Sequence, residues 1–182
     1  MSTPSSGSGL KTFTAVIAVI FGLVLLIGGV YLAVLGGSWY YIIAGLLFIA
    51  TAVLLQKLKS TALIVYALLV LGTVVWGLWE VGSDFFALAP RLDILGLFGL
   101  WLLIPAVTRG FDNVKSAKLV LTGSLAITIA VMIYAVFNDP QEIRGELSSK
   151  QPATAQSISG VADGDWPAYG RTQSGLRYSP LT

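Results

Sequence analysis

The sequence contains five long apolar runs that no lysine, arginine, aspartate or glutamate interrupts. An apolar helix needs about 20 residues to cross a hydrocarbon layer about 30 Å thick. The runs are continuous rather than alternating, so they predict helices and not the strands of a membrane barrel. We therefore expect an all-α membrane bundle of five transmembrane helices at residues 13–35, 39–55, 61–79, 94–108 and 119–137.

The shortest of these runs, at residues 94–108, contains Pro105 near its C-terminal end. It reaches a spanning length only if Leu92 and Asp93 lie in the outer interface or if neighbouring helices screen it. Pro105 is expected to kink this helix or to end it. The first run, at residues 13–35, is longer than the apolar core of a secretory signal peptide, so we interpret it as an uncleaved anchor.

Composition supports lipid as the main solvent and excludes several kinds of chemistry. Hydrophobic residues make up 55% of the chain and charged residues 11%, whereas charged residues make up about 25% of ordinary soluble domains. The chain has no cysteine and no histidine, which excludes thiolate nucleophiles, the usual zinc sites and His-dependent triads. A net charge of +2 does not indicate a nucleic-acid partner.

The basic residues near the span ends predict the orientation of the helices. With a cytoplasmic N-terminus, only Arg91 among the basic residues of the short loops faces outward. The six that face the cytoplasm are Lys11, Lys57, Lys59, Arg109, Lys115 and Lys118. We therefore expect a multi-pass protein with its N-terminus in the cytoplasm and its C-terminus outside.

The segments that flank the apolar runs differ from them in character. Residues 1–12 are rich in serine and glycine and predict a disordered cytoplasmic tail ahead of the anchor at residues 13–137. Residues 138–162 are expected to form a polar linker outside the membrane. At residues 163–182, two runs with tryptophan or tyrosine flank a glycine-containing turn, which predicts the start of a further folded domain.

Two groups of segments carry a family signature. Residues 165–171 and 177–181 are similar to the segment that leads into the first blade of a propeller in the membrane-bound, PQQ-dependent (quinoprotein) glucose dehydrogenases. The segments that resemble the membrane anchor of that family are 36–41, 44–45, 76–82, 84–85, 90–91, 93–95 and 137–143. They follow the family's order, and the resemblance extends over nearly the whole chain.

The resemblance implies a bacterial inner-membrane enzyme with a periplasmic eight-bladed propeller. That propeller would bind PQQ and a divalent metal (Ca or Mg), oxidise D-glucose to gluconolactone and pass electrons to ubiquinone. In that family the PQQ-binding, metal-binding and catalytic residues lie in the propeller, beyond Thr182 of this chain. The resemblance therefore places no catalytic residue here, and we expect the 182-residue segment alone to be inactive.

A second interpretation assigns the chain to a different class of protein. It could be a non-catalytic membrane subunit or scaffold that tethers a related PQQ-dependent polyol dehydrogenase. Residues 165–181 favour the first interpretation, because a stand-alone subunit has no need of a propeller start.

One loop combines charged residues with aromatic residues at the expected outer interface. Its candidate functional residues are Trp79, Glu80, Asp84, Arg91 and Asp93, with Trp76, Phe85 and Phe86 beside them. One interpretation is an aromatic belt with a solvated loop in which Arg91 pairs with acids. The other is a docking surface for the propeller or the mouth of a quinone channel. Glu80 is informative because a carboxylate at the edge of the hydrocarbon is costly unless it is paired or hydrated.

Small residues recur at four-residue spacing in the first run, at Gly29, Ala33 and Gly37. Such a pattern permits close approach of helices in lipid. It predicts either packing within the five-helix bundle or contact with a second copy of the chain.

Overall fold

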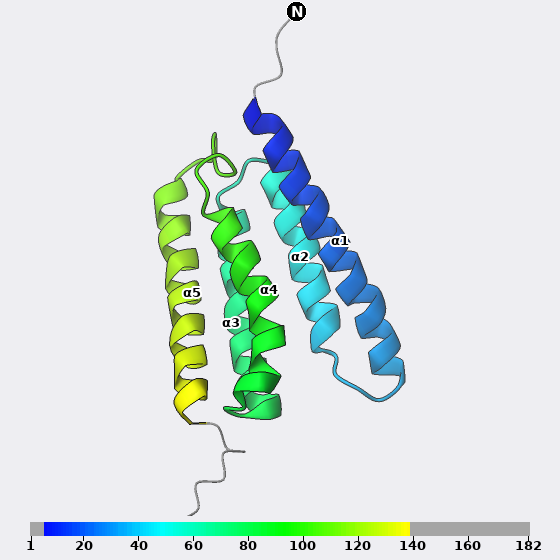
Figure 1. The fold of residues 1–182 in the computed structure, drawn as a ribbon. Coiled ribbons are helices and arrows are strands. Elements are labelled where there is room, and N and C mark those ends of the chain that lie inside the picture. The colour runs from blue at the N-terminus through cyan, green and yellow to red at the C-terminus, as the bar shows by residue number, and fades with distance from the viewer. Residues whose placement is uncertain (1–5, 139–182) are drawn as a thin grey trace, which may run out of the picture. The chain divides into compact units, whose positions relative to one another are not determined.

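The computed structural model describes residues 6–138, which form five helices that alternate in direction (Figure 1). Each end of the bundle has a hydrogen bond between two segments that are far apart in the sequence. At one end the Ser60 backbone N–H donates to Asp112, and at the other the Ser83 hydroxyl donates to the Asn138 carbonyl. The helices are α1 Ser6–Val34, α2 Tyr40–Gln56, α3 Thr61–Val81, α4 Phe85–Leu102 and α5 Val114–Phe137.

The expected all-α fold is confirmed for the described residues. By length and composition, α1, α3, α4 and α5 are candidate membrane spans. The 17 residues of α2 extend over about 25 Å, somewhat less than a hydrocarbon layer. The linker predicted for residues 138–162 and the propeller start predicted for residues 163–182 lie outside the described residues, apart from Asn138.

The outer surface of the bundle is apolar, as a lipid-facing surface must be. Large hydrophobic side chains remain more than half exposed on all five helices, among them Ile27, Ile43, Val75, Leu97 and Ile129. In water such a surface would be costly, but lipid tails solvate it as well as other side chains do. The described helices are therefore suited to a bilayer.

Helix α1 begins at Ser6, seven residues before the start of the predicted span at residue 13. The helix thus extends into the segment predicted as a disordered tail at residues 1–12. The added residues include Lys11, whose long side chain can reach the interface while the backbone stays helical. Residues 1–5 lie outside the described part of the chain.

The fourth span is displaced toward the N-terminus relative to the prediction of residues 94–108. Helix α4 begins at Phe85 because the Asp84 side chain accepts a hydrogen bond from the Ala87 N–H at 3.0 Å and caps its first turn. Arg91 and Asp93 therefore lie on a helix and not in a loop. The helix ends at Leu102, so Pro105 follows the end of the helix and does not kink it.

Aromatic rings from four helices form the centre of the core. Phe21 of α1, Phe48 of α2, Tyr66 of α3 and Phe98 of α4 contact one another with ring centroids 5.4–6.2 Å apart. The Tyr66 hydroxyl donates to the Leu95 carbonyl at 2.7 Å. This pairing satisfies the hydroxyl, so a buried tyrosine is tolerated at this depth.

Glycines allow α1 and α2 to approach closely. A Cβ atom at Gly45 would lie 2.7 Å from the Gly22 carbonyl oxygen, and one at Gly29 would lie 2.7 Å from the Ile42 nitrogen. Gly29 thus packs within the bundle, one of the two predicted alternatives. Gly37 lies beyond the end of α1 at Val34, so the predicted stripe does not continue along the helix to that residue. The four-residue spacing of small residues also did not predict the contact between Gly22 and Gly45.

Candidate functional site

Charged and aromatic side chains meet where the C-terminal part of α3 faces the first turns of α4 and the start of α2. Arg91 is at the centre of this group. Its Nη2 atom lies 3.4 Å from Glu80 Oε2, and its Nη1 atom donates to the Ala87 carbonyl. The guanidinium carbon lies 5.6 Å from the centroid of the Trp76 ring. These three contacts hold the cation within an apolar helix.

One nitrogen of Arg91 lacks a hydrogen-bond partner. Among the buried side-chain nitrogen and oxygen atoms in the described part of the chain, only Arg91 Nε has none. A guanidinium nitrogen always carries its proton and can only donate. This donor is therefore unused and buried, and it is not presented at a surface.

An aromatic wall faces Arg91. The Tyr40 ring stacks on Trp76 with centroids 4.2 Å apart, and Tyr41 meets the same indole edge to face at 5.2 Å. The Tyr40 hydroxyl is hydrogen-bonded to the Thr73 hydroxyl. Thr73 itself donates to the Leu69 carbonyl at 2.8 Å, so Tyr40 is the donor to Thr73. Both hydroxyl protons of this pair are thus already used.

These groups line a cavity of about 540 Å³ among α1, α2, α3 and α4. Apart from Arg91, Thr73 and the two tyrosine hydroxyls, its walls are aliphatic and aromatic side chains. Tyrosine and tryptophan favour the boundary between hydrocarbon and water, and Tyr40 is the first residue of α2. The cavity is therefore expected to lie just inside that boundary.

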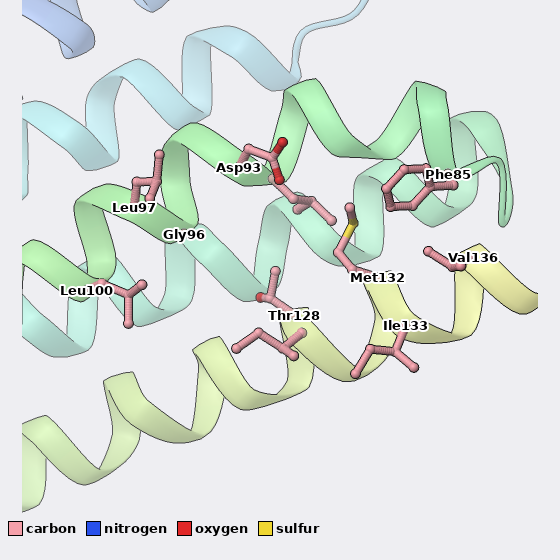
Figure 2. Close-up of a pocket in the computed structure, with 11 residues that line it drawn as sticks. Phe85, Asp93, Gly96, Leu97, Leu100, Thr128, Met132, Ile133 and Val136 are labelled. Atoms are coloured by element: carbon pink, nitrogen blue, oxygen red, sulfur yellow. The ribbon is translucent and has the colours of Figure 1, made fainter.

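A second hollow, of about 550 Å³, lies between α4 and α5 (Figure 2). Leu97 and Leu100 of α4 and Met132 and Ile133 of α5 form its apolar walls. Asp93 is the charged residue of this lining, and within residues 6–138 no hydrogen bond or ion pair of its carboxylate is found.

The structure brings together only some of the residues that were predicted as a site. Glu80 and Arg91 form an ion pair. Trp79 is 83% exposed and directed away from the core, Asp84 caps α4, and Asp93 lines the other hollow. The sequence did not indicate that the residues lining the cavity among α1, α2, α3 and α4 form one group.

The residues that were missed are Tyr40, Tyr41 and Thr73. From the sequence, Tyr40 and Tyr41 were noted only as part of segment 36–41, which carries the family resemblance. Their neighbours in space are far along the chain, since Tyr40 and Thr73 are 33 positions apart. No spacing rule connects two helices over such a separation, so no local signal could have identified the cavity.

Comparison with known proteins gives close relatives. The chain is 62% identical over 181 residues to quinoprotein glucose dehydrogenase A of Acinetobacter calcoaceticus, covering 100% of the chain and 23% of the relative. It is 53% identical over 173 residues to quinoprotein glucose dehydrogenase of Escherichia coli (strain K12), covering 94% of the chain and 22% of the relative. The chain thus spans about a quarter of these relatives, at their N-terminal region.

A third relative is much shorter. The chain is 37% identical over 103 residues to the glycerol dehydrogenase small subunit of Gluconobacter thailandicus, which covers 55% of the chain and 81% of the relative. No protein-family model matches the chain, and no solved structure matches it.

Proposed function

Because the chain belongs to the family formed by the N-terminal regions of quinoprotein glucose dehydrogenases and by the glycerol dehydrogenase small subunit, we propose that it is the membrane anchor of a quinoprotein glucose dehydrogenase. The whole protein would oxidise D-glucose to gluconolactone in the periplasm and pass electrons to ubiquinone. The observation that carries this proposal is 62% identity over the full length of the chain.

The cofactors of this reaction would be bound outside the described helices. Within residues 6–138 there is no group of three or more acidic, histidine or cysteine side chains that could hold a metal ion. The described residues therefore offer no metal site of this composition. The proposed division of labour places PQQ and Ca or Mg in the propeller, and it gives this chain the tasks of anchoring and of contact with the lipid phase.

We expect all five helices to cross the inner membrane, with the N-terminus in the cytoplasm. The connections at one end of the bundle contain Lys57, Lys59 and Arg109, and Lys115 is at the start of α5. At the other end, Glu80 and Asp84 flank the connection between α3 and α4. This asymmetry supports a cytoplasmic basic end and a periplasmic acidic end.

Reporter fusions test this orientation. Fusions after Ser60 and after Lys115 are expected to give cytoplasmic signals, because both positions belong to the basic end. A fusion after Lys150 is expected to give a periplasmic signal, because five crossings place that residue outside. Paired alkaline phosphatase and green fluorescent protein reporters measure the two cases. A periplasmic signal at Ser60 would contradict the arrangement.

The periplasmic end offers a surface for docking of the propeller or for contact with quinone. Trp79 and Phe86 are 83% and 79% exposed there. The residues proposed as docking or quinone-proximal residues are Trp79, Glu80, Asp84, Arg91 and Asp93. Exposed aromatic side chains beside a held cation are typical of such contact surfaces.

A second candidate function is supported by the short relative. The chain covers 81% of a glycerol dehydrogenase small subunit, so a module of this kind also exists as a separate polypeptide. The chain could then serve as a scaffold for a related PQQ-dependent polyol dehydrogenase. Residues 165–181, which resemble a propeller start, favour the first proposal.

Activity measurements distinguish the two functions. We expect membranes with the full-length protein, PQQ and Ca or Mg to reduce ubiquinone when glucose is added. Membranes with residues 1–182 alone are expected to show no activity under the same conditions, because the cofactor sites would be missing. Full-length membranes without PQQ are the control. Glucose-dependent dye reduction by residues 1–182 would contradict the division of labour, and co-purification of a separate polyol dehydrogenase would support the scaffold function.

A further inference from the structure

Basic side chains gather at the end of the bundle that contains the start of α1 and the connections from α2 to α3 and from α4 to α5 (Figure 1). Asp112 is the acidic residue at this end, and it accepts a hydrogen bond from the Ser60 backbone N–H at 3.2 Å. The basic residues are Lys11, Lys57, Lys59, Arg109, Lys115 and Lys118. Six cations thus accompany one carboxylate, and this end of the bundle attracts anions.

Two of these cations meet where the contact between α1 and α4 ends. The Lys11 ammonium nitrogen lies 3.8 Å from the position that a Cβ atom would take at Gly110, the residue after Arg109. One turn further along α1, Thr14 accepts a hydrogen bond from the Trp101 indole N–H of α4 at 3.0 Å. Lys11 and Thr14 are three positions apart, so they lie on the same face of α1. This face of α1 therefore brings Lys11 to the turn that contains Arg109.

The charges of Lys11 and Arg109 are accessible and are not paired. Arg109 is exposed and Lys11 is partly exposed, and within residues 6–138 neither forms an ion pair. The Asp112 carboxylate is bonded to the residue that follows Lys59, so its negative charge is held at the connection from α2 to α3. Two neighbouring cations without a bonded carboxylate favour a ligand that carries a negative charge.

The surroundings of this pair are apolar on the side of the hydrocarbon. Phe13, Val16 and Ile20 of α1 follow Lys11 along the helix and are half or more exposed. Ile104, just after the end of α4, is also exposed. A free anion would gain only the charges, whereas an amphiphile would also place its acyl chains on these side chains. The combination of charge and apolar surface therefore favours a phospholipid over a soluble anion.

We propose that an anionic phospholipid of the cytoplasmic leaflet binds where the contact between α1 and α4 ends, with its phosphate between Lys11 and Arg109. Phosphatidylglycerol has the required net negative charge, whereas the choline of phosphatidylcholine offsets its own phosphate. The bound headgroup would hold the start of α1 beside the connection from α4 to α5. The proposal rests on the proposed orientation in the membrane and is independent of glucose oxidation.

Native mass spectrometry of the full-length protein in detergent micelles tests the proposal, because titration with phosphatidylglycerol gives the Kd of the first bound lipid. Lys11→Gln and Arg109→Gln are each expected to raise this Kd about fivefold, since each removes one cation from the headgroup. Lys11→Arg keeps the charge and is expected to retain the wild-type Kd. Phosphatidylcholine is expected to bind equally weakly to the wild type and to all variants. Circular dichroism checks that each variant keeps the wild-type helix content.

Lys59→Gln is the matched control, because it removes the same charge at the same end of the bundle but next to Ser60, which is bonded to Asp112. Its Kd is expected to equal that of the wild type. An equal rise in Lys59→Gln and Lys11→Gln would overturn the proposal in favour of diffuse attraction, and wild-type affinity in both Lys11→Gln and Arg109→Gln would also overturn it.

Inorganic phosphate separates a lipid site from a site for a free anion. At an ionic strength matched with chloride, phosphate is expected to leave the bound phosphatidylglycerol in place, because it gains nothing from the apolar side chains. Displacement of the lipid by phosphate would overturn the proposal and assign the pair of cations to a soluble anion. Failure of the proposed function looks different, since glucose oxidation would then be absent in the full-length protein while the lipid Kd and its dependence on Lys11 persisted.

Discussion

Replacement of Tyr66 by alanine is expected to lower the free energy of unfolding of the bundle by about 4 kcal/mol. Tyr66 is fully buried, and its ring contacts those of Phe48 and Phe98 at 5.6 and 5.4 Å. Helices in lipid associate mainly through packing, because lipid tails are as apolar as the side chains. Removing the ring leaves a void at the junction of three helices that neighbouring side chains cannot fill.

Tyr66→Phe is the control, because it keeps the ring and removes only the hydrogen bond to the Leu95 carbonyl. We expect it to cost about 1 kcal/mol. Reversible unfolding in mixed micelles, followed by circular dichroism, measures both variants. Equal losses in the two would show that the hydrogen bond and not the packing stabilises this region, and no loss in Tyr66→Ala would contradict the position of the ring in the core.

Gly45→Ala is expected to destabilise the pairing of α1 with α2 by about 3 kcal/mol. The added Cβ atom would lie 2.7 Å from both the Gly22 carbonyl oxygen and the Leu26 nitrogen. These are backbone atoms, so no side-chain rotation can relieve the overlap and the two helices must separate. The loss should appear as a lower midpoint of thermal unfolding.

Gly72→Ala is the matched control on α3, where no atom lies within 4 Å of the added Cβ atom. Alanine is a better helix former than glycine by about 1 kcal/mol, so this variant is expected to be neutral or slightly more stable. The two substitutions are chemically identical, but only Gly45→Ala should lower the stability of the bundle. If Gly45→Ala were as stable as Gly72→Ala, the close contact between α1 and α2 would be wrong.

The uncharged-run rule predicted all five helices, but it began the first span seven residues late and the fifth span five residues late, and it misplaced the fourth. Predicted spans at residues 39–55 and 61–79 differ from α2 and α3 by two residues or fewer at each end. The rule excluded residues 85–93 because Arg91 and Asp93 interrupt the apolar sequence. The helix nevertheless begins at Phe85, because Asp84 caps its first turn and Glu80 pairs with Arg91.

The sequence by itself determined that the chain suits lipid as its main solvent, that its fold is helical and that the two ends of the bundle differ in charge. These properties depend on composition and on residues close together in the chain, since a helix in lipid must satisfy its own backbone groups within one segment. The family signature is also local, because it consists of short segments in a fixed order.

Only the tertiary structure decided which residues share a site. Tyr40, Trp76 and Arg91 come from three helices and meet in one cavity, whereas Asp93, two positions from Arg91, faces a different hollow. The Gly22–Gly45 contact likewise depends on how α1 crosses α2. The physical reason is that helices in lipid have no strong hydrophobic preference for one another, so the detailed fit of their side chains determines which faces pack.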